Sequence, residues 1–205
     1  MIEKGKTRSE IKHDAILAAA KRAFLEFGVQ GTSMDKLAEM AEVSKRTVYN
    51  HFSTKEELVL HMLSELWTQT MVDVDVPYAP DQPLQEQLLR FVEAEIELVS
   101  GTEFLGLSRA AAQYYMFQPE KLQAAMAEFP TDTTALHRWL KAAMDDGRLR
   151  HADVNVAFDQ LHSLVKGVCY WPQLLGFKPG ITADEKRRLA DESVAMFLDH
   201  YRTKA

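Results

Sequence analysis

The stretch SMDKLAEMAEVSKRTVYNHF, residues 33–52, decides the fold. It predicts two short helices, Met34–Ala41 and Lys45–His51. Each follows a serine, Ser33 or Ser44, whose hydroxyl can accept a hydrogen bond from the free amides at a helix start. Only three residues separate the two helices. This length and spacing are typical of a helix-turn-helix, in which the second helix enters the major groove of DNA.

The second short helix also has the side chains that such a role requires. At 3.6 residues per turn, Val48 and Phe52 share one side, which is suited to packing inward. The outward arc carries groups that can donate hydrogen bonds to base edges or phosphates: Lys45, Arg46, Tyr49 and Asn50. The pattern therefore predicts a surface that reads DNA.

Outside this stretch, the periodicity indicates helices throughout. Apolar residues line one face from Ile11 to Phe27, and Gly28 ends that helix. A longer helix starts at Lys55, after Thr54, and runs to about Thr70. The prolines between Val76 and Pro83 indicate a linker. Further helices are predicted at Leu84–Ser100, Phe104–Phe117, Glu120–Phe129, Thr133–Asp146, Val154–Leu174 and Ala183–Tyr201.

No strand pattern competes, so we expect an all-α protein. An N-terminal three-helix domain with the helix-turn-helix would span residues 1–54, and a larger helical bundle would span residues 55–205. The chain has 205 residues, of which 46% are hydrophobic and 26% charged, and this excludes a disordered chain. A disulfide scaffold is excluded by the single cysteine, Cys169, which its apolar and aromatic neighbours predict to be buried and inert.

No apolar run is long enough to cross a membrane, and no apolar stretch follows the basic residues at the N-terminus. We therefore expect a soluble cytoplasmic protein without membrane contact. The net charge of −6 is unevenly placed, because residues 1–60 carry +1 and residues 61–205 carry −7. On composition alone, the first segment is an ordinary solvated surface, and its asymmetry with the rest only hints at two separate roles.

The segment Ile16–Leu58 resembles the TetR family of bacterial transcriptional regulators. The resemblance rests on Ile16-Leu17, Ala19-Ala20, Phe24, Gly28, Thr32-Ser33-Met34, Leu37-Ala38, Ala41, Val43-Ser44, Thr47-Val48-Tyr49, His51-Phe52, Lys55 and Leu58. One departure is Glu42, where the family usually has glycine. If that turn requires a positive φ, glutamate strains it by about 1 kcal/mol.

The resemblance implies a DNA-binding set of Ser33, Ser44, Lys45, Arg46, Thr47, Tyr49, Asn50, His51 and Lys55. Ser33 and Lys55 stand at helix starts and would hold phosphates. His51 would contact phosphate or pack, and the residues that would read the major groove are Lys45, Arg46, Thr47, Tyr49 and Asn50. The basic residues Lys4, Lys6 and Arg8 either add DNA contacts or form a solubilising tail.

Beyond about Trp67 the resemblance is one of architecture, and it is similar to the AefR-type C-terminal subgroup. It implies a bundle that binds a small molecule and forms a dimer. Candidate pocket residues are Phe104, Leu107, Tyr114, Phe117, Trp139, His162 and Trp171, although each alone is more often plain core. Candidate dimer helices are Ala183–Tyr201, with a stripe of Ala190, Val194, Phe197 and Tyr201, and Val154–Leu174, with Leu161, Leu164, Val165 and Val168. Both stripes could instead pack within one chain.

Other chemistry has little support in the sequence. The histidines form no metal-binding spacing, no cofactor motif is present, and Glu93, Glu95 and Glu97 are predicted to form a solvated face. The leading hypothesis is a homodimeric repressor that binds a palindromic double-stranded DNA operator and is released by a small, partly apolar ligand. The alternatives are a family member without an inducer, acting as an occlusion factor or activator, and an all-α enzyme that uses the C-terminal bundle.

Overall fold

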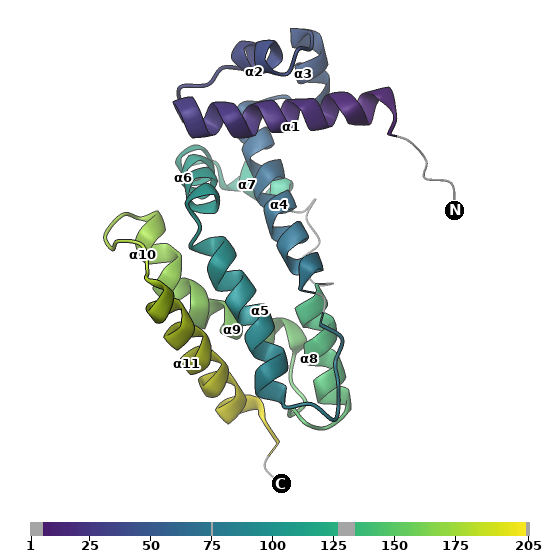
Figure 1. Ribbon diagram of the computed structural model, residues 1–205, viewed down its shortest axis with the longest axis vertical. Helices are drawn as coiled ribbons and strands as arrows, with labels where there is room; N and C mark the ends of the chain where they lie inside the picture. Colours follow the sequence, from purple (N-terminus) through teal and green to yellow (C-terminus); the bar gives the residue numbers. More distant parts are fainter. Residues whose placement is uncertain (1–5, 75, 127–133, 204–205) are drawn as a thin grey trace. The chain divides into compact units, whose positions relative to one another are not determined.

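The structure is a computed structural model that describes residues 6–74, 76–126 and 134–203 (Figure 1). The described residues form two compact units, one from 6–64 and 106–126 and the other from 65–74, 76–105 and 134–203. The helices are α1 Arg8–Phe27, α2 Met34–Met40, α3 Lys45–His51, α4 Lys55–Asp73, α5 Leu84–Val99, α6 Thr102–Tyr115, α7 Pro119–Met126, α8 Ala135–Asp145, α9 Val154–Cys169, α10 Trp171–Leu174 and α11 Ala183–Tyr201. The predicted all-α class is confirmed, since the described residues contain no strand beyond one isolated bridge between Leu149 and Arg202.

In the first unit, α1 starts earlier than the apolar pattern predicts. Thr7 and Glu10 form a capping box, in which each side chain accepts from the other's backbone N–H, and this fixes the helix start at Arg8. Arg8 is therefore a helix residue, and of the predicted basic arm only Lys6 precedes the helix among the described residues, because Lys4 lies outside them. Gly28 ends α1 as predicted, with a φ of 70° and its N–H bonded to the Phe24 carbonyl.

The two short helices form as predicted, and their serines cap them. The Ser33 hydroxyl accepts from the Lys36 amide at 3.1 Å, and the Ser44 hydroxyl accepts from the Thr47 amide at 3.1 Å. These helices pack on α1 and on each other, as Figure 1 shows. A seven-residue helix is too short to be stable alone, so caps and tertiary packing hold this hairpin.

The turn after α2 contains a residue with positive φ, which is the condition under which glutamate is expected to be strained. The Val43 N–H bonds to the Ala38 carbonyl and the Glu42 N–H to the Glu39 carbonyl, both at 3.1 Å, which is the Schellman pattern. The residue in the left-handed position of that motif is Glu42, with a φ of 54°. It is the one non-glycine residue with positive φ in the described chain.

The second unit is a bundle in which α5, α9 and α11 pack together, α8 and α10 lie on α9, and the end of α4 joins the core through Trp67. Trp139 is 1% exposed at its centre and donates through Nε1 to the Gln87 side-chain oxygen at 3.1 Å. Gln87 also bonds both the N–H and the carbonyl of Ala79, at 2.9 Å each. One buried amide thus fixes the proline-rich linker to the core.

The predicted helix Val154–Leu174 is confirmed as far as Cys169, and its continuation to Leu174 is wrong. The chain leaves helical geometry at Tyr170, where φ is −121° and ψ is −64°, and the four-residue α10 follows. Pro172 explains the break, because it has no N–H and its ring would collide with the carbonyl of a preceding helical turn. The predicted helices at Glu120–Phe129 and Thr133–Asp146 are seen as α7 and α8, and residues 127–133 lie outside the described chain.

The packing units do not follow the predicted division at residue 54. The first unit includes the start of α4 and also residues 106–126, from α6 and α7. The division between a DNA-binding part and a ligand-binding part stays a prediction about function. In the chain that the structure describes, no helix has both the length and the apolar content to span a membrane.

Candidate nucleic-acid interface

The second short helix, α3, faces its unit with one side and solvent with the other. Val48 is fully buried and Phe52, directly after the helix, is 4% exposed. Tyr49 is 52% exposed, and Lys45, Arg46 and Asn50 are also exposed. The geometric prediction for this helix is therefore confirmed, and its hydrogen-bond donors lie on one solvated surface.

The two cations at the start of α3 differ in their partners. The Lys45 ammonium lies 2.5 Å from the Asp35 carboxylate on α2, in an exposed ion pair. Arg46 has no ion pair or hydrogen bond with any described residue. An unpaired guanidinium on a solvated helix start can form the two parallel hydrogen bonds that guanine offers in the major groove. Arg46 is thus the stronger candidate for reading bases.

Ser33, Ser44 and Thr47 contribute to the hairpin itself. The two serine oxygens accept hydrogen bonds from backbone amides, and the Ser44 hydroxyl lies 2.8 Å from the Thr47 hydroxyl. A hydroxyl that caps a helix can still donate its hydrogen to a phosphate oxygen. The prediction that Ser33 and Ser44 contact DNA stays a prediction, and their capping role is what the structure shows.

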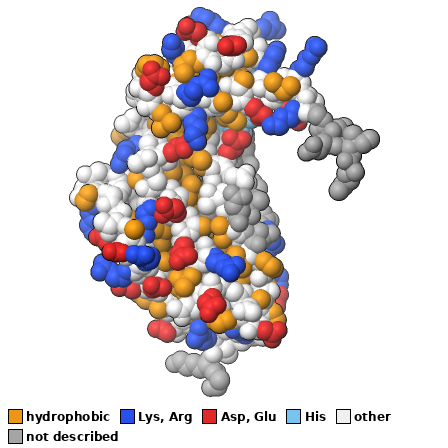
Figure 2. Space-filling view, in the orientation of Figure 1, with side chains coloured by type: hydrophobic (Ala, Val, Ile, Leu, Met, Phe, Trp, Pro, Cys, Tyr) orange, Lys and Arg blue, Asp and Glu red, His pale blue; other side chains and the backbone are white. Residues whose placement is uncertain are grey.

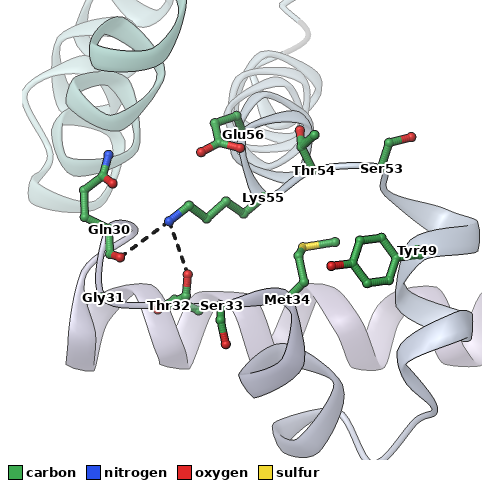
Figure 3. Close-up of a pocket in the computed structure, with 10 residues that line it drawn as sticks. All are labelled: Gln30, Gly31, Thr32, Ser33, Met34, Tyr49, Ser53, Thr54, Lys55 and Glu56. Atoms are coloured by element: carbon green, nitrogen blue, oxygen red, sulfur yellow. Dashed lines mark hydrogen bonds between the residues drawn. The ribbon is translucent and has the colours of Figure 1, made fainter.

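A surface pocket of about 450 Å³ lies beside the hairpin. It is lined by the loop after α1, Tyr49 of α3 and the first residues of α4. Figure 3 shows the Tyr49 ring beside the Met34 side chain and the Lys55 side chain extending from α4 toward the loop. The pocket thus brings the starts of α2 and α4 to one surface.

Lys55 is engaged in a way that the sequence does not predict. Its ammonium donates to the carbonyls of Val29 at 2.9 Å and Thr32 at 3.3 Å, and the Gln30 carbonyl lies at 3.5 Å (Figure 3). The side chain ties the start of α4 to the loop after α1. A phosphate contact by this ammonium, which stays a prediction, would have to replace at least one of these bonds.

His51 packs inside an aromatic cluster. Its ring lies 5.6 Å from that of His13, and the rings of His13, His61 and Phe52 lie within 5.1–5.4 Å of one another. The cluster joins α1, α3 and α4 within the first unit. Of the two predicted roles for His51, packing is the one that the structure shows.

The surface of α1, α2 and α3 carries several Lys and Arg side chains with acidic ones among them (Figure 2). Arg22 on α1 bonds to the Met40 carbonyl at 3.1 Å, and Lys6 pairs with Asp14 at 2.6 Å. Lys6 is therefore held along α1 as an ion pair. On the face that Figure 2 shows, the basic groups are interrupted by acidic and neutral ones.

The predicted pocket residues do not belong to one unit. Leu107, Tyr114 and Phe117 lie in the first unit, and Phe104, Trp139, His162 and Trp171 in the second. Two of them are poorly placed for an enclosed pocket, since Phe117 is 85% exposed and Trp171 is 51% exposed. The pocket role of both residues stays a prediction. Phe117 lies beyond the end of α6, and Trp171 follows the break before Pro172.

His162 is the predicted pocket residue with polar surroundings. Its Nδ1 is hydrogen-bonded to the Glu95 carboxylate, and both side chains are buried. The prediction of a solvated face is wrong for Glu95, which is 2% exposed. Residues two apart point to opposite sides of a helix, so Glu95 faces away from Glu93 and Glu97. The signal was available, because Glu95 falls within the buried stripe Leu88, Phe91, Val92, Ile96 and Val99.

Cys169 is buried as predicted, and burial raises the pKa of its thiol to about 12, with the nearby charge of Glu95 acting in the same direction. The described residues contain no group of three or more histidine, cysteine or acidic side chains arranged to hold a metal ion.

Comparison with known proteins agrees with this geometry. Residues 16–62 match the model of bacterial regulatory proteins of the tetR family, and residues 86–203 match the C-terminal domain of AefR-like transcriptional repressors. The crystal structure of a TetR family transcriptional regulator from Pseudomonas syringae pv. tomato str. DC3000 is 36% identical, with a TM-score of 0.72 over 95% of this chain and 98% of that one.

Two further relatives extend the comparison. The flavonoid-responsive regulator FrrA is 25% identical, with a TM-score of 0.68 over 95% of this chain and 98% of that one. The HTH-type regulator YhgD of Bacillus subtilis is 35% identical over 82 residues, which is 40% of this chain and 43% of that protein. Each of these proteins is a regulator. The chain belongs to the TetR family of DNA-binding transcriptional regulators, and its C-terminal domain is AefR-like.

Proposed function

We propose that this protein is a homodimeric repressor that binds a palindromic operator through α3 and is released by a small, partly apolar ligand. The observation that carries the proposal is the solvated surface of α3, where Arg46 has no partner among the described residues while Val48 anchors the helix. A helix with hydrogen-bond donors on its solvated side can bind a polar, anionic partner there. A cytoplasmic location follows from the proposal, since the operator lies on the chromosome.

The proposed dimer uses the outer surface of α9 and α11, and not the stripe that the sequence indicates on α11. Ala190, Val194, Phe197 and Tyr201 are at most 2% exposed and pack within their own chain, which is the alternative that the sequence leaves open for this stripe. The apolar residues that remain exposed are Val156, Val168 and Met196. A groove of about 440 Å³ between α9 and α11 lies next to Val156 and Met196.

A two-fold contact across this groove would form a four-helix interface from two helices of each subunit. It would also present two copies of α3. Dimeric helix-turn-helix proteins bind half-sites one turn of DNA apart, about 34 Å centre to centre. The proposed operator is therefore palindromic.

The proposed ligand response uses the helices that have residues in both units. The sequence predicts α4 as the transmitting element, and α6 is a second one, because residues from Gly106 onward belong to the first unit. A ligand that binds the DNA-incompetent arrangement more tightly weakens operator binding by the same factor. The name of FrrA, a flavonoid-responsive regulator of the same fold, supports a small-molecule effector.

The DNA-binding proposal is tested by fluorescence anisotropy with the DNA upstream of the protein's own gene, at two salt concentrations. We expect saturable binding that outcompetes unrelated DNA and weakens with salt. Arg46→Ala should weaken it about tenfold or more, since a good bidentate base contact contributes about 1–3 kcal/mol. Arg90→Ala removes an exposed arginine from α5 and should leave binding unchanged. Equal losses in both variants would contradict the role of α3.

The dimer is tested by sedimentation velocity. Met196→Asp places a charge on the proposed interface, where Met196 is 52% exposed, and should yield monomers. Met116→Asp changes a 62% exposed methionine in the first unit and should leave a dimer. A Met196→Asp protein that stays dimeric would overturn this interface. A monomeric wild-type protein would overturn the dimer itself.

A further inference from the structure

Two ionisable side chains are buried side by side inside the second unit. Glu95 on α5 is 2% exposed and His162 on α9 is 7% exposed, within a core of apolar residues. The Glu95 carboxylate is hydrogen-bonded to Nδ1 of His162, and the Lys166 ammonium lies 3.8 Å from the same carboxylate oxygen. A buried carboxylate stays ionised only where such partners compensate for lost hydration, and the lysine supplies the opposite charge.

This arrangement fixes the protonation pattern of the imidazole ring. A carboxylate can only accept a hydrogen bond, so Nδ1 of His162 must carry the hydrogen. In the neutral ring with its hydrogen on Nδ1, Nε2 keeps a free lone pair and is an acceptor. That atom is buried and has no hydrogen-bond partner among the described residues.

Another buried polar contact in this unit shows how such groups are satisfied in a purely structural role. The Gln87 oxygen accepts from both Trp139 and Ala79, and its amide nitrogen donates to the Ala79 carbonyl. That network is satisfied, as buried polar groups in native proteins normally are. In the cluster of Glu95, Lys166 and His162, the Nδ1 atom of the imidazole has a hydrogen-bond partner and the Nε2 atom has none. This difference indicates a missing donor.

The surroundings of His162 indicate the chemistry of that donor. The Phe158 ring meets the His162 ring edge to face at 3.9 Å, and the Trp67 ring lies at 5.3 Å. Lys166 lies over the Trp67 ring, 4.9 Å from its centroid. Aromatic walls with one oriented polar atom favour a flat apolar ligand with one matching polar group. A neutral acceptor nitrogen requires a hydrogen-bond donor, and we take a hydroxyl as that donor.

We propose that Nε2 of His162 accepts a hydrogen bond from the hydroxyl group of an aromatic effector whose ring packs against Trp67 and Phe158. Glu95 and Lys166 are positioning residues that hold the imidazole as an acceptor. The inference rests on the proposed ligand response and specifies its ligand class. Methoxy or unsubstituted analogues lack the donor and leave Nε2 unpaired, so the site selects against them.

The test uses matched probes and isothermal titration calorimetry without DNA. The pairs are 7-hydroxyflavone with flavone and 7-methoxyflavone, 4-phenylphenol with biphenyl, and 1-naphthol with 1-methoxynaphthalene. We expect at least one hydroxyl compound to bind about tenfold tighter than its partners, the value of one well-formed hydrogen bond. No binding by any hydroxyl compound, or equal affinity within every pair, would overturn the proposal.

His162→Phe keeps an aromatic ring and removes Nε2, so the preference for the hydroxyl compound should fall to about onefold. His137→Phe is the matched control, because this buried histidine also stacks on Phe158, at 3.9 Å. It should keep the preference. A preference that survives in His162→Phe and disappears in His137→Phe would assign the acceptor to the wrong histidine and overturn the proposal.

A second measurement covers the case in which His162→Phe fails to fold. Long-range ¹H–¹⁵N spectra of the wild-type protein should show His162 protonated at Nδ1 alone. The Nε2 resonance should shift with the hydroxyl compound and not with its methoxy partner. A ring protonated at Nε2 without ligand would contradict the inference. Operator anisotropy with the same probes is a separate arm: selective binding without operator release keeps the site and overturns only the inducer role.

Discussion

Helices α3 and α9 both bury apolar residues, but α9 also buries a histidine and exposes two valines. In α3, Val48 is buried and the hydrogen-bond donors are exposed; in α9, His162 is buried and Val156 and Val168 are exposed. A helix with donors outside is suited to a charged, hydrated partner such as DNA. A helix with apolar residues outside is suited to another subunit, and its buried polar group to a small molecule. This difference supports the proposals that DNA binds the outer surface of one unit and that the effector binds in the interior of the other.

The largest expected effect concerns how closed that interior is. The pKa of the buried Cys169 thiol is raised from 9.0 to about 12, so at pH 8 its thiolate fraction is about 1000-fold lower than in the unfolded chain. Modification by 5,5′-dithiobis(2-nitrobenzoate) should be slower than in guanidinium chloride by at least that factor. Equal rates in the native and unfolded protein would show that the interior is open to solvent and would contradict a closed core around Cys169.

The next effect concerns the link between the two units. Trp67 on α4 contacts His162 and Lys166, so we predict that Trp67→Ala keeps operator affinity and loses the response to effector. Couplings in such proteins are about 1–3 kcal/mol, so an effector that weakens wild-type operator binding tenfold should change the variant's binding less than twofold. Anisotropy with and without a saturating hydroxyl compound measures this, and calorimetry gives the concentration that saturates the variant, because Trp67 also lines the proposed site. A response that persists undiminished would rule out Trp67 as a coupling residue.

A third prediction compares the same turn in the two units. Schellman motifs end α2, α8 and α10, and the left-handed residue is Glu42 in the first, but Gly147 and Gly176 in the others. Glu42→Gly should raise the free energy of unfolding by about 1 kcal/mol, because glycine relieves the strain of positive φ. Gly147→Ala should lower it by a similar amount. Urea denaturation measures both, and a destabilised Glu42→Gly protein would mean that its side chain stabilises the hairpin.

The smallest effect sharpens the description of the DNA-reading surface. Asp35→Asn removes the ion pair that holds Lys45 and an exposed negative charge beside α3. Lys45 then becomes available to phosphate, and we expect operator affinity to rise about threefold, with the salt dependence steeper by about one ion. Asp191→Asn, at an exposed position of α11, is the control and should change neither value. Weaker binding by Asp35→Asn would show that the Lys45–Asp35 pair is needed to position α3.

The features that could be predicted from the sequence are those that local interactions determine. Ser33 and Ser44 cap their own helices, so the hairpin and the facing of Val48 followed from neighbouring residues. Thr7 and Glu10 are an equally local signal, and applying the capping rule to them would have placed the start of α1. The role of Lys55 could not be predicted, because its partners are loop carbonyls more than 20 residues earlier in the chain.

The second unit depends on contacts that are distant in the sequence. Glu95 and His162 are 67 residues apart, and only the packing of α5 on α9 brings them together. The apolar stripe on α11 was a correct sign of an amphipathic helix, but a stripe does not reveal whether its partner is the same chain or another. Val194 and Phe197 pack against other residues of the same chain.

The measurement that tests the account most directly is operator affinity, without effector, for Arg46→Ala and His162→Phe side by side. The account predicts that Arg46→Ala loses about tenfold or more in affinity, because its guanidinium lies on the DNA-reading surface. It predicts that His162→Phe binds the operator as tightly as wild type, because its histidine belongs to the interior of the other unit. The opposite result, with Arg46→Ala unaffected and operator binding lost in a folded His162→Phe protein, would contradict it.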